Sequence, residues 1–357
     1  MSSRPDRAVD QAKLEAFLGK VVGDLGATLS IELALIGDKL GLYRAMKEAG
    51  PITSEELANK TGTSERYIRE WLLHQAASGY VDYNSTTQQY ALPPEQALAL
   101  ATEDSPFFVG GGFQVAAAMT RAQDRVLENF KTGKGMLWSE HHSDLFRGTE
   151  RFFRASYIGH LVGDWIPSVP GLQEKLKAGT VVADVGCGHG ASTVIMAQAF
   201  PNSKFFGFDN HEPSIERASQ SARDAGLSDR VTFEVAGSGN FPNKKFDMIA
   251  FFDCLHDMGD PVSACKRARE TLKQDGVVML VEPMAGARLE DNFNPVGRVY
   301  TGASVLCCMP NALASGPIAL GTVPTDEELG KVLAAGGFTR FRRATETPFN
   351  RVFEARP

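Results

Sequence analysis

A glycine-rich loop followed by an aspartate is the first group of residues able to bind a ligand. The loop runs from Asp184 to Gly190, and its alternate glycines let the backbone turn tightly and approach a ligand without a Cβ in the way. Asp209 stands about 20 residues after the first glycine, where a carboxylate can accept both hydroxyls of a ribose. The pattern predicts a site for an adenosine-containing cofactor. It leaves a nicotinamide dinucleotide open, because that fingerprint permits alanine where Ala191 stands.

A histidine directly follows a later apolar run. His256 stands in Leu255-His256-Asp257, just after the apolar stretch 246–252. A neutral imidazole, with an ordinary pKa of about 6.5, can take a proton from a hydroxyl at neutral pH. A carboxylate on its other nitrogen would fix the tautomer and stabilise the imidazolium. We therefore expect His256 to be a general base, the alternative being a structural cap of the helix that begins near Asp260.

Strands and helices alternate in the second half of the chain. Short apolar runs predict strands at 180–185, 204–208, 231–235, 246–252 and 277–281. Helical patterns at 191–200, 213–225 and 261–272 separate them, and 338–343 and 351–355 suit a closing hairpin. This order predicts an α/β fold with a doubly wound, mostly parallel sheet, whose ligands bind at the carboxyl ends of the strands. The glycine loop, the aspartate and the histidine all fall at those ends.

Residues 1–95 predict a helical and winged-helix domain. Apolar residues recur at steps of three and four between 11 and 46, and this stripe must be covered by another surface. We expect a second subunit to cover it. Two short helices beginning at Ser54 and Ser64, then extended stretches at 80–83 and 89–92, predict the winged helix. Three basic residues against five acidic ones between 51 and 92 disfavour DNA recognition and favour a dimerisation or lid role.

Two further segments supply candidates for contact with a substrate. Residues 96–170 predict a helical linker region rich in aromatic side chains, most of which would fill the seam between domains. Residues 289–324 predict an insertion rich in glycine, proline and asparagine, and long loops of this kind commonly act as lids. The candidate side chains are Trp138, His141, His142 and Tyr157 in the first segment, and Asn294, Arg298 and Tyr300 in the second.

Composition narrows the class of protein. The 357 residues are 43% hydrophobic and 22% charged, which suits two globular domains and excludes a disordered or fibrous chain. The net charge of −6 argues against nucleic acid as the main partner. No apolar run is long enough for a membrane helix, and the first residues lack the apolar core of a secretory leader. The five cysteines and seven histidines show no zinc-binding spacing, so we expect a reduced, cytoplasmic protein with no metal.

Three runs, 182–190, 253–261 and 275–283, resemble the class I S-adenosylmethionine-dependent methyltransferases. The chain is similar over nearly its whole length to two-domain members with an N-terminal winged helix, namely the plant-type small-molecule O-methyltransferases and an actinobacterial-type group. The resemblance implies a seven-stranded catalytic domain over residues 171–357, S-adenosylmethionine as cofactor and a small-molecule acceptor. The implied cofactor-binding residues are Asp184, Gly186, Gly188, Gly190, Asp209, Asn210, Gly237, Ser238 and Asp253.

The resemblance also implies catalytic roles. His256 aligns with the general base of a Leu-His-Asp-Trp motif, Glu282 with the acid that orients it, and Asp257 with a neighbour that caps a helix or supports the base. Three features depart from the pattern. Met258 stands where the motif has tryptophan. The acid expected after the third strand is absent, so Ser238 or a backbone carbonyl would contact the adenine. Residues 320–324 contain no second acid to support the base.

Several functions stay open at this point. The expected reaction is methyl transfer to a hydroxyl by a homodimer. A first alternative keeps the cofactor but transfers the methyl group to sulfur or nitrogen, and a thioether acceptor needs no base. A second is a winged-helix regulator of transcription that senses the cofactor. A third is an oxidoreductase that uses NAD.

Overall fold

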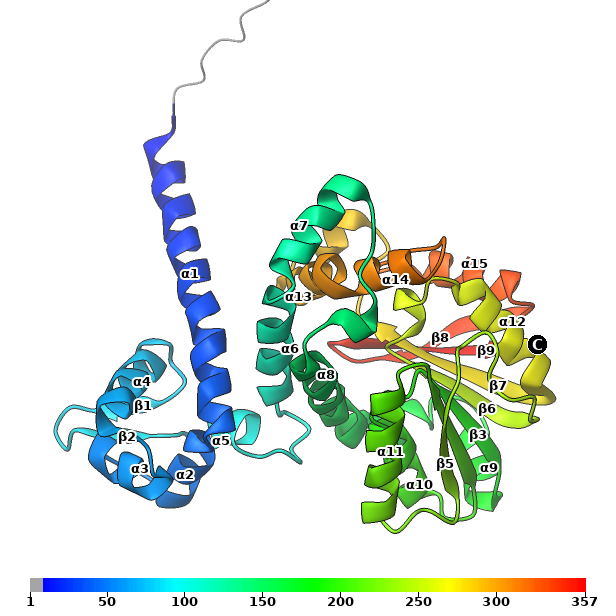
Figure 1. Cartoon of the computed structure of the whole chain (residues 1–357), viewed down its shortest axis with the longest axis horizontal. Coiled ribbons are helices and arrows are strands. Elements are labelled where there is room, and N and C mark those ends of the chain that lie inside the picture. The colour runs from blue at the N-terminus through cyan, green and yellow to red at the C-terminus, as the bar shows by residue number, and fades with distance from the viewer. Residues whose placement is uncertain (1–8) are drawn as a thin grey trace, which may run out of the picture. The chain divides into compact units, whose positions relative to one another are not determined.

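The computed structural model describes residues 9–357 (Figure 1). The chain divides into two compact units. The first contains residues up to 103 together with 108–113, and the second contains 104–107 and 114–357. None of the helices in the described part of the chain is both long and apolar enough to cross a bilayer.

The first unit begins with the long helix α1 (Gln11–Lys39), which Asp10 caps by accepting a hydrogen bond from the backbone N–H of Lys13. Most of the apolar side chains of the predicted stripe are exposed on this helix. The exposed members are Leu14, Leu18, Leu25, Leu29 and Ile36, with Leu40 just after the helix, and Phe17 and Val22 of α1 are exposed beside them. Within its own unit, therefore, α1 leaves an apolar face uncovered.

The winged helix follows as the sequence predicts. It consists of α2 (Leu42–Ala49), α3 (Ser54–Thr61), α4 (Glu65–Ala77) and an antiparallel pair of short strands, β1 (Asp82–Asn84) and β2 (Gln89–Ala91), before α5 (Pro94–Leu100). Both arginines of α4 form ion pairs within the helix: Arg66 pairs with Glu70, and Arg69 pairs with Glu65. The helix that would read DNA thus offers few free cations to phosphate groups.

The second unit contains helices ahead of its sheet. These are α7 (Gln123–Thr132), η1 (Trp138–Glu140), α8 (Ser143–Ser156), η2 (Tyr157–Trp165) and α9 (Leu172–Ala178), and α6 (Gly110–Thr120) leads into them. The aromatic side chains of η2 are buried: Tyr157 and Trp165 are 7% and 0% exposed. They belong to the apolar core on one face of the sheet.

Seven strands form one mixed sheet in the order β5-β4-β3-β6-β7-β9-β8 (Figure 1). The strands are β3 (Val181–Val185), β4 (Lys204–Asp209), β5 (Val231–Val235), β6 (Phe246–Phe252), β7 (Leu272–Pro283), β8 (Arg340–Glu346) and β9 (Asn350–Arg356). The first five are parallel to their neighbours, and β9 runs antiparallel to β7 and β8. The predicted doubly wound, mostly parallel seven-stranded sheet is confirmed.

Alternate residues of the central strands enter two separate cores. Val182 packs with α9, α10 (Ala191–Ala199) and α11 (Glu212–Asp224), whereas its neighbour Ala183 packs with α12 (Pro261–Thr271) and α15 (Asp326–Ala335). Because side chains of a strand alternate between faces, near-continuous apolar runs are what a sheet covered on both sides requires. The layers hold the carboxyl ends of β3, β4, β6 and β7 at one edge.

The insertion is a set of helices rather than the glycine-rich and proline-rich loop that the sequence predicts. It contains η4 (Leu289–Asn292), α13 (Pro295–Ala303), η5 (Ser304–Cys308) and α14 (Met309–Ser315). Asn294 caps α13 by accepting from the N–H of Gly297, and Pro295 follows at the first helical position. Asparagine and proline are common both at helix starts and in loops, and here they start a helix.

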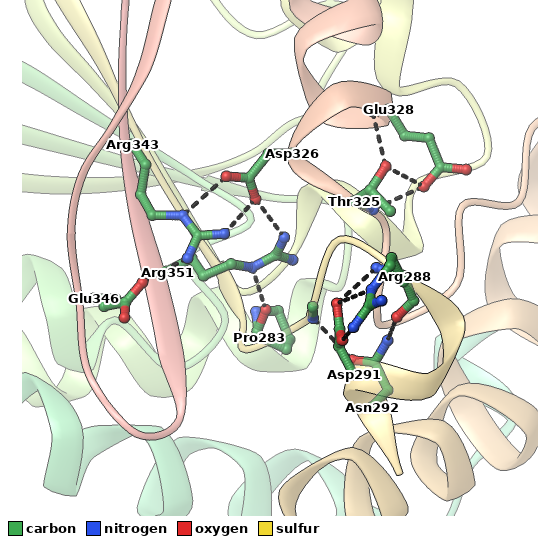
Figure 2. Close-up of polar contacts among 11 residues, drawn as sticks. Pro283, Arg288, Asp291, Asn292, Thr325, Asp326, Glu328, Arg343, Glu346 and Arg351 are labelled. Atoms are coloured by element: carbon green, nitrogen blue, oxygen red, sulfur yellow. Dashed lines mark hydrogen bonds and ion pairs between the residues drawn. The ribbon is translucent and has the colours of Figure 1, made fainter. Parts of the chain in front are cut away.

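A buried arginine ties the end of β7 to the closing hairpin (Figure 2). Arg351 of β9 is fully buried, and its Nε donates to the carbonyl of Pro283 at 2.9 Å. Its Nη1 donates to Asp326 at 2.8 Å, and Asp326 also accepts from Arg343 of β8. Nε and Nη1 are thus paired, as a buried cation requires, whereas Nη2 is buried without a partner. The contacts hold the carboxyl end of β7, where Glu282 lies.

Candidate functional site

A cavity of about 680 Å³ opens at the carboxyl edge of the sheet, within the second unit. Its walls come from the loops after β3, β4, β5 and β6 and from the helices α8 and α14. This volume lies in the range that small-molecule sites occupy. Parallel α/β sheets bind their ligands at this edge.

The glycine loop after β3 has a backbone that only glycine adopts easily. Gly186, Gly188 and Gly190 have φ angles of 76°, 51° and 79°, all in the left-handed region. A Cβ on Gly186 would stand 2.7 Å from the sulfur of Cys254, and one on Gly190 would stand 2.5 Å from the ring of Phe233. Gly186 and Gly188 line the cavity, so this part of the loop presents backbone, not side chains, to a ligand.

Asp184 lies beneath this loop and does not line the cavity. One of its oxygens accepts hydrogen bonds from the hydroxyls of Ser192 and Thr193, both at 2.6 Å, at the start of α10. Burial raises the pKa of Asp184 to about 6. Its contacts therefore join the loop to the following helix, and any contact with a cofactor would use its second oxygen, which has no partner.

Asp209 ends β4 and faces the cavity. One carboxylate oxygen accepts from the N–H of Gly188 at 2.9 Å and the other from the N–H of His211 at 2.9 Å. Burial raises the pKa of Asp209. Asn210, Gly237 and Ser238, which the resemblance implies for cofactor binding, also line the cavity, on the loops after β4 and β5.

His256 and Glu282 meet where β6 and β7 end. The imidazole Nδ1 lies 2.6 Å from one Glu282 oxygen, and the backbone N–H of His256 donates to the other oxygen at 3.3 Å. The two side chains are 4% and 0% exposed. A carboxylate only accepts hydrogen bonds, so Nδ1 carries a proton, and in the neutral ring Nε2 is then the nitrogen with the lone pair.

Electrostatics around His256 favour its protonated form. Burial alone lowers the pKa of His256, but the negative charges of the Glu282 carboxylate and of Cys308 as a thiolate oppose it and raise this pKa well above 6.5. The imidazolium that a base forms by taking a proton is therefore stabilised, and the ring acts as a base only from its neutral form, which a higher pH favours. Asp257 lines the cavity beside it, and burial raises the pKa of Asp257 to about 8.

The residue that caps helix α12 (Pro261–Thr271) is Asp260. Its carboxylate accepts from the N–H and hydroxyl of Ser263 at the start of α12. Neither His256 nor Asp257 caps that helix. The capping roles considered for these two residues are therefore not what the structure shows, because Asp260 stands at the position where a side chain reaches the first turn.

Asp253 combines an unusual backbone with an unpaired oxygen. Its φ is 52°, in a region that residues other than glycine seldom adopt. Asn350 of β9 donates to one carboxylate oxygen at 2.7 Å, while the other is buried without a partner. Asp253 lines the cavity, and burial raises its pKa well above the ordinary value. Such strain persists at functional sites.

The predicted substrate residues divide into two sets. Trp138 and Tyr157 line the cavity, together with Phe146 and Phe153 of α8. Four others do not. His142 caps α8 and contacts Arg121, Asn294 caps α13, Arg298 is exposed, and Tyr300 donates to the carbonyl of Phe349. His141 is buried, and both its ring nitrogens lack partners.

Sequence reasoning missed several residues that lie at this site. Asn350 contacts Asp253, and Asn311 and Ser315 of α14 line the cavity. Asn311 also donates to the carbonyl of Asp257 at 3.0 Å. These residues come from the closing hairpin and from the insertion, whose positions against the sheet no local pattern encodes.

Two family models match this chain. Residues 176–337 match a family described as a methyltransferase domain, and residues 27–102 match the Rv2258c-like winged HTH domain. Over 107 residues the chain is 33% identical to 27-O-demethylrifamycin SV methyltransferase of Amycolatopsis mediterranei (strain S699), a match that covers 29% of this chain and 39% of that enzyme. The chain spans less than half the length of the curated relatives it matches first.

Solved structures resemble the chain over almost its whole length. The structure of mitomycin 7-O-methyltransferase MmcR has a TM-score of 0.69 at 20% identity and covers 98% of this chain and 100% of its own. Human N-acetylserotonin methyltransferase (ASMT), in complex with SAM, has a TM-score of 0.69 at 17% identity, with 100% and 99% covered. At these identities the likeness establishes the fold, and it agrees with the predicted class I fold preceded by a winged helix.

Proposed function

Because the chain belongs to the class I S-adenosylmethionine-dependent methyltransferases, we propose that it transfers a methyl group to a hydroxyl of a small molecule, with His256 as general base. The observation that carries the proposal is the 2.6 Å contact between His256 Nδ1 and Glu282 at the edge of the sheet. This contact leaves Nε2 as the proton acceptor. The names of two similar proteins, which methylate oxygen of a rifamycin and of a mitomycin, support a hydroxyl acceptor.

The residues present fit S-adenosylmethionine. A Cβ on Gly188 would stand in open space at the cavity, with no atom within 4 Å, and Asp209 presents its carboxylate to the same cavity. We assign the adenosine to Asp209, Asn210, Gly237 and Ser238, and the amino-acid end to the loop 186–190. The unpaired oxygen of Asp253 is a further acceptor for the cofactor's ammonium. When bound, the cofactor supplies a methyl group on a positively charged sulfur.

The protein's own residues then position the acceptor and remove its proton. Nε2 of His256 takes the hydroxyl proton as the oxygen attacks, and Glu282 stabilises the imidazolium so formed. Proximity supplies much of the rate in such a displacement on carbon. The walls of Trp138, Phe146, Phe153 and Tyr157 favour a planar, apolar acceptor over a charged one.

Calorimetry with S-adenosylhomocysteine tests the cofactor assignment. We expect wild type to bind this product, and Asp209→Asn to bind about ten- to a hundredfold more weakly, because a charged hydrogen-bond acceptor is lost. Asp229→Asn, a change at an exposed aspartate, is the matched control. Binding of NADH in place of the adenosyl ligand would refute the assignment.

The acceptor is tested by measuring turnover against phenols, carboxylates, amines and thiols. Transfer to amines or thiols alone would refute the hydroxyl acceptor.

We also propose that the apolar face of α1 pairs with the same face of a second copy. Side chains such as Leu18, Val22, Leu25 and Leu29 are more than half exposed, and a row of this size is seldom left in water. We expect Leu18→Lys with Leu25→Lys to convert a dimer to a monomer in light-scattering measurements. Ala16→Lys with Ala27→Lys adds the same charge to the opposite face and is expected to leave the dimer intact. Equal masses for the two double variants would contradict the proposal.

A further inference from the structure

Three different kinds of metal ligand meet beside the base. His256 and Asp257 belong to the short helix η3 (Leu255–Asp257), and Cys308 ends η5. A ring nitrogen, a carboxylate oxygen and a sulfur of these residues all lie within 4.8 Å of one another. His256 and Cys308 stand far apart in the sequence, which is why no metal-binding spacing shows in the chain.

The distances suit a small tetrahedral ion after a modest closure. Zinc bonds of about 2.0–2.3 Å place neighbouring ligand atoms about 3.3–3.6 Å apart in a tetrahedral site. The observed limit of 4.8 Å therefore requires side-chain shifts of about 1 Å, as an estimate from the same bond lengths. A thiolate, an imidazole and one carboxylate select a soft or borderline cation such as Zn²⁺ over Mg²⁺ or Ca²⁺, which prefer oxygen.

The surroundings of His256 are those of a metal-binding imidazole. Histidine ligands commonly donate their second N–H to a carboxylate, which orients the ring and raises its affinity for the ion. Glu282 supplies that carboxylate at Nδ1, at 2.6 Å, and leaves Nε2 for the ion. Of the three ligands only Asp257 lines the cavity, and the ligand atoms of His256 and Cys308 lie within 4.8 Å of its own, so an ion would enter past Asp257.

We propose that His256, Asp257 and Cys308 form a binding site for one soft divalent cation of the Zn²⁺ type. Three protein ligands leave a fourth position for water or another small ligand. An ion bound at Nε2 removes the lone pair that would take the proton of the acceptor. Occupation of the site therefore inhibits methyl transfer reversibly. The binding itself does not depend on the proposed function.

Binding of Zn²⁺ alone to the purified full chain tests the proposal. In competition with a chromophoric chelator we expect one ion per chain for wild type and for Cys265→Ala, which removes a buried thiol in α12. Cys308→Ala is expected to bind at least about tenfold more weakly, since loss of even an outer partner costs that much. Co²⁺ is expected to give a thiolate charge-transfer band in wild type that Cys308→Ala lacks. Equal Zn²⁺ affinity for wild type and Cys308→Ala, or absence of the band in wild type, would overturn the site.

Activity supplies a second, separate measurement. Once an acceptor is known, Zn²⁺ is expected to stop turnover by wild type and a chelator to restore it, while Cys308→Ala resists the same concentration. Inhibition of both proteins to the same degree would refute the link between the ion and the base. If the protein binds Zn²⁺ through Cys308 but methylates no acceptor, the proposed function is refuted and the metal site is still supported.

Discussion

His256→Ala is expected to lower turnover by about 10²–10⁴-fold with a weakly acidic hydroxyl acceptor, the range that a positioned base contributes. The imidazole is the group with a free lone pair at Nε2, because Nδ1 is committed to Glu282. Affinity for S-adenosylhomocysteine is expected to stay at the wild-type value, since His256 is not among the residues that we assign to the cofactor; it lies behind Asp257, which lines the cavity. Calorimetry and initial rates on the same preparations measure both quantities.

The acidity of the acceptor separates loss of a base from loss of structure. A nitrophenol that is already ionised at neutral pH needs no base, so His256→Ala should methylate it nearly as fast as wild type does. A variant that has lost its fold would be slow with every acceptor. His160→Ala, which removes an exposed imidazole paired with Asp164, is the matched control. Wild-type rates for His256→Ala with an un-ionised alcohol would end the case for a base.

Local patterns were sufficient for most of the sheet. The apolar runs at 181–185 and 246–252 are strands buried on both faces, and such strands cannot show the alternation of a half-exposed one. The beginning of β7 at Leu272 was harder to place, because Lys273, Gln274 and Asp275 interrupt the apolar pattern before the buried part. The insertion was harder still, since its asparagines and prolines start helices there instead of forming loops.

The site residues that could be predicted from the sequence are those that follow predicted strands. His256 and Glu282 follow neighbouring parallel strands, and Phe252 of β6 pairs with Val281 of β7, so their following residues reach one edge together. The order of strands predicted from the sequence is therefore enough to predict that His256 and Glu282 lie close together. Asn350 and Cys308 belong to an antiparallel hairpin and a helical insertion, whose contacts depend on packing between distant segments. His142 and Asn294 were misleading because a polar side chain at a helix start serves as a cap.

Glu282→Gln is expected to lower turnover with weakly acidic acceptors by about 10²–10⁴-fold, in line with loss of the carboxylate that orients a catalytic histidine. Both oxygens of Glu282 are used: one accepts from Nδ1 and the other from the backbone N–H of His256. An amide has only one accepting oxygen, so glutamine leaves one of these donors facing an N–H₂ group. The ring then adopts the wrong tautomer or turns away, and the developing imidazolium loses its counter-charge.

Three comparisons identify this as an effect on the histidine. Glu282→Gln should follow His256→Ala in its dependence on acceptor acidity, with little loss for an ionised phenol. Glu282→Asp keeps both oxygens and the charge on a shorter arm, and we expect a rate between those of wild type and glutamine. Glu354→Gln removes another largely buried carboxylate of the same sheet, which pairs with Arg342 and Arg356, and it should leave the acidity dependence unchanged. A uniform loss of rate for Glu282→Gln across all acceptors, with unchanged thermal unfolding, would mean that Glu282 acts on something other than the proton held by His256.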